Sequence, residues 1–417
     1  MNAFIALPLS IRVALVFAAG VLLGAVVNWA IYALAWFSRP ISPWQTRHPA
    51  AAPRRWRDFL PITGWLSLRR EAPLHGTAFW VRPLLLELIT GAGLAALYLW
   101  ETSSNLAPPL PLVAPPNALM LHHEFVSHLL LIVLMLVATF IDFDEKTIPD
   151  EITIPGALLG LALAALWPDS HLPVVRILPA LAIDGYGPLL LTSTDAWPAW
   201  LNGPRGLWLG IAILFAWCIA LIPALCTLRR GWKKAVQFYF ASAARHSNWW
   251  KMLLLGVFGS LAIVAVWRQG GPSWQALLTA LVGLAFGGGM IWAVRIVGSI
   301  ALHKEAMGFG DVTLMAMIGA FLGWQACFVI FFFSPFVALF IALAQWVLTG
   351  RRDIPYGPYL CAAALVVIIK WPAVWGYIGP LFKEGWLLPA LLAVGLMLMM
   401  GLLMLWRIIE QALFGRG

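Results

Sequence analysis

The stretch His303-Lys304-Glu305-Ala306-Met307-Gly308-Phe309-Gly310-Asp311 stands immediately before a long apolar run, 312–349. It places the carboxylate of Asp311 directly behind two glycines and at the mouth of a hydrophobic segment. A charged side chain at the end of a membrane helix is costly to retain, so it marks a candidate functional site. The glycines allow backbone turns that other residues resist, and they let another chain approach closely. A Gly-x-Gly-Asp string alone is a weak signal, and its meaning depends on a second carboxylate at the same membrane face.

The composition of the chain indicates a polytopic membrane protein. Hydrophobic residues make up 62% of the 417 positions and charged residues only 11%, which excludes an ordinary soluble domain. The net charge of +9 requires no nucleic acid as a partner, because clustered Lys and Arg in a membrane protein usually mark its cytoplasmic loops. The four cysteines lie in or at the ends of apolar runs without CxxC spacing, which predicts neither a zinc site nor a disulfide framework. They are Cys218, Cys226, Cys327 and Cys361.

The apolar runs predict an all-α, polytopic membrane helical bundle with about eleven transmembrane helices and a cytoplasmic loop after the first helix. The run 312–349 must hold two of the passes, with a break near Gly323 or near Ser334-Pro335. The single passes are expected at 13–37, 84–100, 127–141, 153–167, 207–227, 252–267, 276–302, 356–371 and 386–408.

The basic residues predict the orientation of these passes. Residues 38–82 carry eight arginines, the strongest positive-inside signal in the chain, and residues 229–251 form a second basic loop. Residues 101–126 contain no Lys or Arg, and we place them outside together with the irregular segment 168–206. This orientation brings both Asp142 and Asp311 to the cytoplasmic face. The pair His122-His123 falls in an outside loop, and no third ligand at useful spacing supports a metal site there.

The predicted passes and loops divide the chain into four parts. Residues 1–37 hold the first transmembrane helix, and 38–82 form a cytoplasmic loop domain that lacks CxxC pairs. Residues 83–167 and 276–417 form the membrane-embedded core. Residues 168–275 are an insertion that adds an extra transmembrane hairpin, which leaves the topology of the core unchanged because the number of added passes is even.

Two aspartates from distant helices are sufficient for an acid–base hydrolysis. Asp142 directly abuts an apolar run, whereas we interpret Asp144, Glu145 and Asp150 as solvated loop charges. One carboxylate of a pair takes a proton from water while the other, protonated, hydrogen-bonds the scissile carbonyl. Two like charges a few ångströms apart do not both ionise easily, so the pair titrates as a unit.

Three motifs occur in a fixed order along the chain. They are Ile141-Asp142 with Thr147-Ile148-Pro149-Asp150-Glu151-Ile152-Thr153, then Lys304-Glu305-Ala306-Met307-Gly308-Phe309-Gly310-Asp311-Val312, and then Ile354-Pro355-Tyr356-Gly357-Pro358-Tyr359-Leu360. In this order they resemble the two catalytic segments and a third element of the type IV prepilin peptidases, membrane aspartic proteases of the GxGD type. The N-terminal half extends the resemblance through Gly24 and Asn28, Leu60–Arg70 and Arg82–Gly91. Together these matches cover most of the chain except about 168–275.

The resemblance implies an enzyme and a set of roles. Asp142 and Asp311 would be the catalytic aspartates, supported in their loops by Gly308, Gly310, Pro149 and Glu305. The substrates would be the basic leader peptides of prepilin or pseudopilin-like precursors, cut at the cytoplasmic face of the inner membrane. We expect membrane lipids as further partners and no nucleic acid.

Proteolysis of this kind needs no cofactor or metal. Members of the family often also N-methylate the new N-terminus, which would require S-adenosylmethionine. Glu87 is a candidate for that methyl transfer, or it has a structural role and pairs with Arg82.

The chain departs from the family pattern in three places. Bacterial members often carry two CxxC pairs in the first cytoplasmic loop, and this chain has no cysteine there, so it resembles a zinc-less variant. The residue after Gly-Asp-Val is usually Lys and here is Thr313. The insertion 168–275 is the third departure.

Two other classes of function remain open from the sequence. In a transporter or channel, Asp142 and Asp311 would form a proton or cation relay, although such acids usually lie near the middle of the membrane and these lie at helix ends. In a protease-like scaffold, the chain would bind pilin precursors without cutting them.

Overall fold

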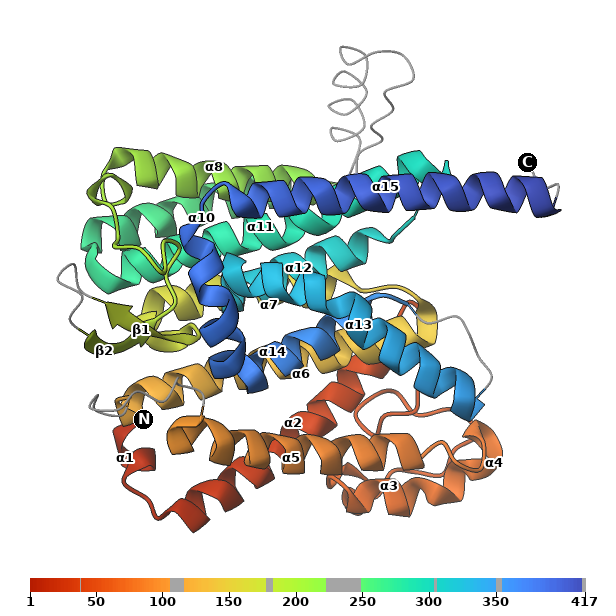
Figure 1. The fold of residues 1–417 in the computed structure, drawn as a ribbon. Coiled ribbons are helices and arrows are strands. Elements are labelled where there is room, and N and C mark those ends of the chain that lie inside the picture. The colour runs from red at the N-terminus through yellow and green to blue at the C-terminus, as the bar shows by residue number, and fades with distance from the viewer. Residues whose placement is uncertain are drawn as a thin grey trace.

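The structure is a computed structural model, and it describes residues 1–37, 39–105, 116–177, 183–222, 249–303, 306–349 and 355–414. Within these residues the fold consists of long helices packed side by side, with one small β-hairpin (Figure 1). The long helices are α2 (Leu9–Leu34), α5 (Val81–Trp100), α6 (Ala118–Glu145), α7 (Asp150–Leu166), α8 (Pro204–Ala220), α10 (Trp249–Gln269), α11 (Gly271–Leu302), α12 (Phe309–Leu322), α13 (Trp324–Thr349), α14 (Gly357–Ile378) and α15 (Leu387–Phe414).

Each predicted pass corresponds to one of these long helices, and the chain is an all-α, multi-pass membrane protein. Eight of the described helices are long and apolar enough to cross a membrane, and α8 and α12 are shorter apolar helices. The break in the run 312–349 lies at Gly323, whose φ of 82° ends α12 in a conformation that favours glycine. Pro335 lies inside α13 instead.

The prediction that residues 101–126 form one outside loop was wrong at its end. Helix α6 begins at Ala118, so His122 and His123 are helical. His122 Nε2 lies 3.0 Å from the hydroxyl of Tyr98, and the ring of His123 stacks on Trp167. Nine residues of helix were missed because the polar side chains at this end of α6 interrupt its apolar pattern.

The segment 168–206 is also more regular than predicted. Strands β1 (Pro173–Ile177) and β2 (Ile183–Pro188) pair antiparallel. Trp371 of α14 donates its indole N–H to the carbonyl of Pro173 at 2.8 Å, and Leu172 and Leu189 are fully buried. The hairpin was missed because its strands are short and rich in Gly and Pro, residues that are uncommon in strands.

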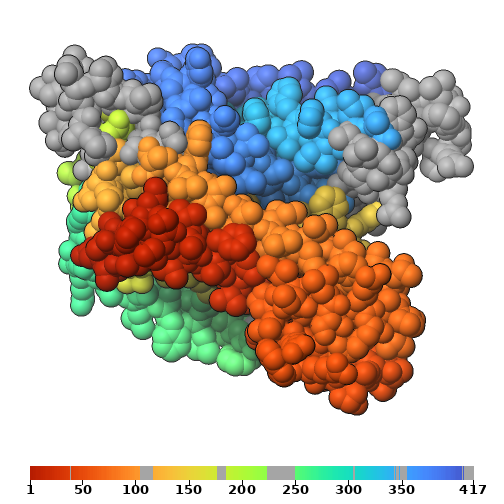
Figure 2. Space-filling model, turned by 90° about the horizontal axis from the view of Figure 1, so that it is seen from below, coloured from red at the N-terminus to blue at the C-terminus, as the bar shows by residue number. Residues whose placement is uncertain are grey.

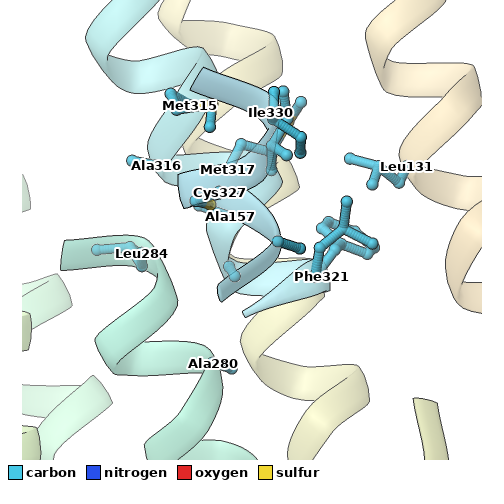
Figure 3. Close-up of a cluster of buried hydrophobic side chains, with 14 of the residues drawn as sticks. Leu131, Ala157, Ala280, Leu284, Met315, Ala316, Met317, Phe321, Cys327 and Ile330 are labelled. Carbon is cyan, nitrogen blue, oxygen red and sulfur yellow. The ribbon is translucent and has the colours of Figure 1, made fainter. Parts of the chain in front are cut away.

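Helix α12 is the centre of the core. Every residue from Asp311 to Leu322 is buried, because α12 packs against α7 and α11 and contacts α13, α6 and α14. Figure 3 shows Met315, Ala316, Met317 and Phe321 of α12 between side chains from these neighbours, among them Leu284, Ala157 and Leu131. A helix that is apolar on all sides belongs inside a bundle, so α12 has little freedom to change position.

Residues 39–80 form a lobe at one end of the bundle, which Figure 2 shows in orange. Its short helical elements are η1 (Trp56–Phe59), α3 (Thr63–Leu68), η2 (Arg69–Glu71) and α4 (Ala72–His75). Trp65 and Leu68 bury their side chains against α2, α5 and α6. The hairpin β1–β2 lies at the opposite end of the bundle (Figure 1).

Buried ion pairs stabilise the lobe in addition to the predicted apolar packing. Asp58 is fully buried and accepts hydrogen bonds from Ser67 Oγ at 2.7 Å, from Arg70 Nη1 at 2.9 Å and from the backbone N–H of Arg55 at 2.6 Å. Glu71 accepts one from Arg54 at 3.0 Å. Burial raises the pKa of Asp58, but the bonds from Arg70, Arg55 and Ser67 outweigh it and hold that pKa well below its usual range.

We therefore expect Arg70→Gln to destabilise the lobe by about 2–3 kcal/mol, because it leaves the buried Asp58 carboxylate without its cation. Arg57→Gln is the matched control, since Arg57 is exposed. The depressed pKa of Asp58 means that its contribution is present above about pH 4 and is lost as the pH falls further. Limited proteolysis of residues 39–80 measures both effects. Equal cleavage rates for the two variants at pH 7 would show that the ion pair does not hold the lobe.

The two ends of the bundle should face opposite sides of the membrane. We expect a cysteine at Arg57 in the lobe to be labelled only from the cytoplasm, and one at Trp200 near the hairpin only from outside, because the lobe carries the arginines. Both side chains are exposed. The labelling uses a variant without the four native cysteines. Residues 229–248 of the predicted basic loop 229–251 lie outside the described residues, and a cysteine there should be labelled from the same side as position 57. If the cysteine at position 57 and the cysteine in the basic loop were labelled from opposite sides, the eleven-pass topology would be ruled out.

Candidate active site

Asp142 lies one turn before the C-terminal end of α6. Lys146 ends that helix with φ of 56°, and Pro149 then precedes α7 as its N-cap. The carboxylate of Asp142 is buried and accepts a hydrogen bond from the backbone N–H of Gly357, the first residue of α14. Its Oδ2 atom has no hydrogen-bond partner among the described residues. The α6–α7 turn thus directs Asp142 toward the beginning of α14.

Asp311 is the third residue of α12, after the N-cap Gly308. It is buried, like the rest of the helix. Because it lies in the first turn, the partial positive charge of the helix N-terminus favours a negative charge on its carboxylate. The N-terminus of α14 acts in the same way on Asp142 through the N–H of Gly357.

Gly357 brings the two carboxylates together. A methyl group built on its Cα would lie 2.6 Å from Asp142 Oδ2 and 3.3 Å from Asp311 Oδ1. The distance between Asp142 Oδ2 and Asp311 Oδ1 is therefore shorter than the sum of these two distances. Only a residue without a side chain leaves this space free, so α6, α12 and α14 meet at one point.

The two aspartates line one cavity of about 860 Å³. Its wall also includes Lys146 and Thr147 after α6, Met307 and Gly308 before α12, and Tyr356 before α14. This space is large enough for a segment of polypeptide. Two carboxylates at its wall are able to share a proton and to bind a water molecule between them.

The supporting residues named from the resemblance occupy different positions. Gly308 and Gly310 line the cavity, and Gly310 also allows close packing, because a methyl group there would lie 2.8 Å from Cβ of Ile148. Pro149 begins α7 beside the cavity. Glu305 lies outside the described residues.

Several residues of the site were not singled out from the sequence. Gly357 and Tyr356 belong to the third motif, 354–360, but the sequence analysis assigned no role to either residue. The hydroxyl of Tyr356 lies 2.5 Å from Ser334 Oγ, and Arg295 Nε donates to the carbonyl of Met307 at 2.9 Å. The sequence Tyr-Gly-Pro at the start of a helix could have indicated a special position for Gly357. Arg295 lies within an apolar helix, and only the packing of the helices shows that its partner is Met307.

Glu87 does not pair with Arg82, contrary to that prediction. It is buried in α5 and its Oε1 accepts from Trp65 Nε1 at 2.7 Å and from Asn28 Nδ2 at 3.1 Å. Its Oε2 accepts from the backbone N–H of Ile62. Glu87 therefore ties the lobe to α2 and α5, as a structural residue does.

The interpretation of Asp144 and Glu145 as solvated loop charges was wrong about the loop, although Asp144 is exposed and Glu145 half-buried. Both lie in the last turn of α6. Asp144 accepts two hydrogen bonds of 2.9 Å from Arg82, and Glu145 accepts from the backbone N–H groups of Trp36 and Phe37. These pairs attach the start of α5 and the end of α2 to α6, near Asp142 but outside the cavity lining.

Comparisons with known proteins agree with the motifs in the second half of the chain. A family model described as the Type IV leader peptidase family matches residues 245–343, a segment that includes Asp311 but not Asp142. No solved structure matches the chain significantly.

Three curated relatives illustrate the similarity. The chain is 32% identical to the prepilin leader peptidase/N-methyltransferase of Aeromonas hydrophila and 33% identical to that of Pseudomonas aeruginosa, in each case over 93 residues, or 22% of this chain and 32% of the relative. It is 28% identical to the type 4 prepilin-like proteins leader peptide-processing enzyme of Escherichia coli O78:H11 over 201 residues, or 47% of this chain and 60% of the relative. The chain thus spans about a third of the length of the first two relatives and 60% of the third.

Proposed function

Because the chain belongs to the type IV leader peptidase family, we propose that it is an integral-membrane aspartic endopeptidase. Its substrates are type IV prepilin or pseudopilin-like precursors, from which it removes the basic leader at the cytoplasmic face of the inner membrane. The observation that carries this proposal is the meeting of Asp142 and Asp311 across Gly357 at the wall of a large cavity.

The geometry supports hydrolysis by a pair of carboxyl groups that share one proton. The ionised carboxylate takes a proton from water, whose oxygen adds to the scissile carbonyl carbon, while the protonated carboxyl donates a hydrogen bond to the carbonyl oxygen. The resulting tetrahedral intermediate loses the amine when that nitrogen receives a proton and the C–N bond breaks. The pair again holds one proton at the end of the cycle.

The surroundings of the pair favour this single negative charge. Asp311 lies in the first turn of α12, and Asp142 accepts from the first N–H of α14. Two helix N-termini therefore point at the shared charge. Burial of both side chains opposes a second negative charge beside the first, so one proton stays on the pair.

The position of the acids argues against a proton or cation relay. Asp142 lies one turn from the end of α6 and Asp311 in the first turn of α12. A relay across a membrane requires ionisable groups near its middle. The open cavity beside the two acids instead suits a polypeptide substrate.

The names of two of the relatives also include N-methyltransferase activity. Both oxygens of Glu87 already accept hydrogen bonds from protein groups, and the side chain is buried. Glu87 thus does not fit a role in contact with S-adenosylmethionine. If the protein also methylates the new N-terminus, the mass of the cleaved product should rise by one methyl group when S-adenosylmethionine is added.

Cleavage of a synthetic precursor tests the proposal. The precursor carries a basic leader followed by an apolar segment of about 20 residues, enough to anchor it in a bilayer. Purified protein in liposomes should release the leader at one peptide bond, identified by the masses of both products. A precursor that stays intact with folded protein would refute the peptidase and leave the binding scaffold as the remaining function.

A further inference from the structure

Four titratable side chains are completely buried at the end of the bundle that carries the hairpin β1–β2, away from the lobe (Figure 1). They come from three segments: the short helix η3 (Glu101–Asn105) after α5, the first half of α6, and the chain after η4 (Pro168–Ser170). None of the four is more than 1% exposed. We refer to them as the buried acid–base cluster, which consists of Glu101, Glu124, His128 and His171.

Most polar atoms of the cluster have no hydrogen-bond partner among the described residues. His128 Nδ1 donates to Glu101 Oε1 at 2.8 Å. The second oxygen of Glu101, both oxygens of Glu124, the Nε2 atom of His128 and both ring nitrogens of His171 are buried without a partner. Buried polar atoms in proteins are normally paired. These atoms therefore need bound protons or a ligand to be stable where they lie.

The proton is the ligand that fits this arrangement. Among the residues that the structure describes, no three His, Cys, Asp or Glu side chains converge so as to hold a metal ion. The unpartnered atoms are also sealed from solvent, and a proton, unlike a larger ligand, needs no cavity.

The number of bound protons follows from the cost of a buried net charge. An uncompensated charge inside a protein is strongly disfavoured. Two ionised glutamates with two neutral histidines carry two negative charges, so two protons make the cluster neutral. One proton on His128 pairs it with Glu101, and the other suits Glu124, which has no cationic partner. His171 stays neutral, because burial lowers the pKa of its imidazole to about 4 and His128 acts in the same direction.

The other titratable groups at this end of the bundle do not enter that balance. Asp169 of η4 is half-buried and acts on Glu124 through space, and Lys370 of α14 is exposed. The second half of α7 and the first half of α11 carry no charged side chain. The remaining groups have partners outside the cluster: Arg12 and His122 bond to Tyr98, and His123 stacks on Trp167.

We propose that the buried acid–base cluster is a proton-binding site that joins the ends of α5 and α7 to α6 only while it carries two protons. The arginines of the lobe place this end of the bundle outside, so the pH of the external medium controls how firmly it is closed. The inference goes beyond the proposed peptidase function and does not depend on it.

The proton count predicts how opening depends on pH. In an opened cluster the side chains titrate near the ordinary pKa values of about 4.3 for Glu and about 6.5 for His. Between these values the opened cluster also binds two protons, one on each histidine, so opening does not depend on pH. Above about pH 6.5 it loses both, and below about pH 4.3 it binds two more. The open fraction should therefore rise by up to about a hundredfold per pH unit on either side.

Hydrogen exchange beside the cluster measures this opening. The N–H of Ser170 donates to the carbonyl of Trp167 at 2.9 Å, and the N–H of Leu189 donates to the carbonyl of Leu172 at 2.7 Å. Mass spectrometry of peptides with these two N–H groups gives the open fraction of the purified protein, after correction for the intrinsic exchange rate. That fraction should be constant between about pH 5 and about pH 6 and rise steeply between about pH 7 and about pH 8.

Two neutral substitutions change the proton count in different ways. Glu124→Gln removes one proton from the closed cluster, so the rise above about pH 6.5 should fall to about tenfold per unit. His171→Gln removes one proton from the opened cluster below that pH. The constant region should then gain a rise of about tenfold per unit, and the steep region should stay unchanged. Asp195→Asn is the matched control, since Asp195 is an exposed carboxylate between the hairpin and α8, and it should alter neither region.

The other outcomes overturn the inference. An open fraction that is the same at about pH 6 and about pH 8, or a hundredfold rise that Glu124→Gln retains, would show that the cluster does not hold two protons. Stoichiometric zinc that protects the same N–H groups and is lost in Glu124→Gln would assign the cluster to a metal instead. If Glu124→Gln does not fold, the profiles of the unsubstituted protein and of His171→Gln still decide.

Discussion

Asp142→Asn and Asp311→Asn should each abolish cleavage of a precursor, with a loss of about 10³-fold or more in kcat. Asparagine keeps the shape of the side chain and most of its hydrogen bonds, but it neither takes up nor gives the proton. The double variant should be no less active than either single one, because the two carboxylates act as a unit. Both variants should insert and fold as the unsubstituted protein does.

Asp150→Asn is the matched control for these variants. Asp150 is exposed in the first turn of α7, close in sequence to Asp142 but outside the cavity lining. Asp144→Asn and Glu145→Gln should also retain much of the activity, since their partners are Arg82 and backbone N–H groups rather than the cavity. An Asp311→Asn protein that cuts precursor at a near-normal rate would end the aspartic-protease proposal.

The shared proton also predicts the pH dependence of cleavage. Activity should fall as the pH rises into the alkaline range, because the pair then loses the proton that polarises the scissile carbonyl. The fall should occur in kcat, measured with saturating precursor. A rate that stays constant far into the alkaline range would mean that no protonated carboxyl takes part.

Gly357→Ala should reduce cleavage by about 10²-fold or more, although it alters no ionisable group. Its methyl group would lie 2.6 Å from Asp142 Oδ2 and 3.3 Å from Asp311 Oδ1, so the two carboxylates must move apart or α14 must shift. Misplacement of reacting groups by about 1 Å is sufficient for a loss of that size. The loss should appear in kcat, since the cavity that binds the precursor remains.

Gly376→Ala provides the control within the same helix. A methyl group at Gly376 meets nothing within 4 Å, and alanine is intrinsically more favourable than glycine in a helix. This variant should therefore match the unsubstituted protein in activity and be at least as stable. Equal activity of Gly357→Ala and Gly376→Ala would show that α14 does not set the distance between the carboxylates.

Sequence alone was sufficient to predict the places of the long helices that the structure describes, because a chain of this composition must arrange its apolar runs as helices that satisfy their own backbone hydrogen bonds. It was less informative where the pattern was mixed. The polar residues at the start of α6 hid the first nine residues of that helix, which include His122, and the run 312–349 left two possible breaks. The structure places the break at Gly323, where α12 ends with a positive φ that favours glycine.

The two aspartates were also predicted from the sequence, because a carboxylate beside an apolar run is costly and therefore informative. Their proximity was not determined by the sequence alone. It depends on α6, α12 and α14 meeting at Gly357, on Ile148 packing against Gly310, and on a lobe tied to the bundle through Glu87. Hydrophobicity and charge act locally along the chain and so identify the helices and the acids, whereas the distance between two acids is set by side chains in contact across three helices, which only the tertiary structure brings together.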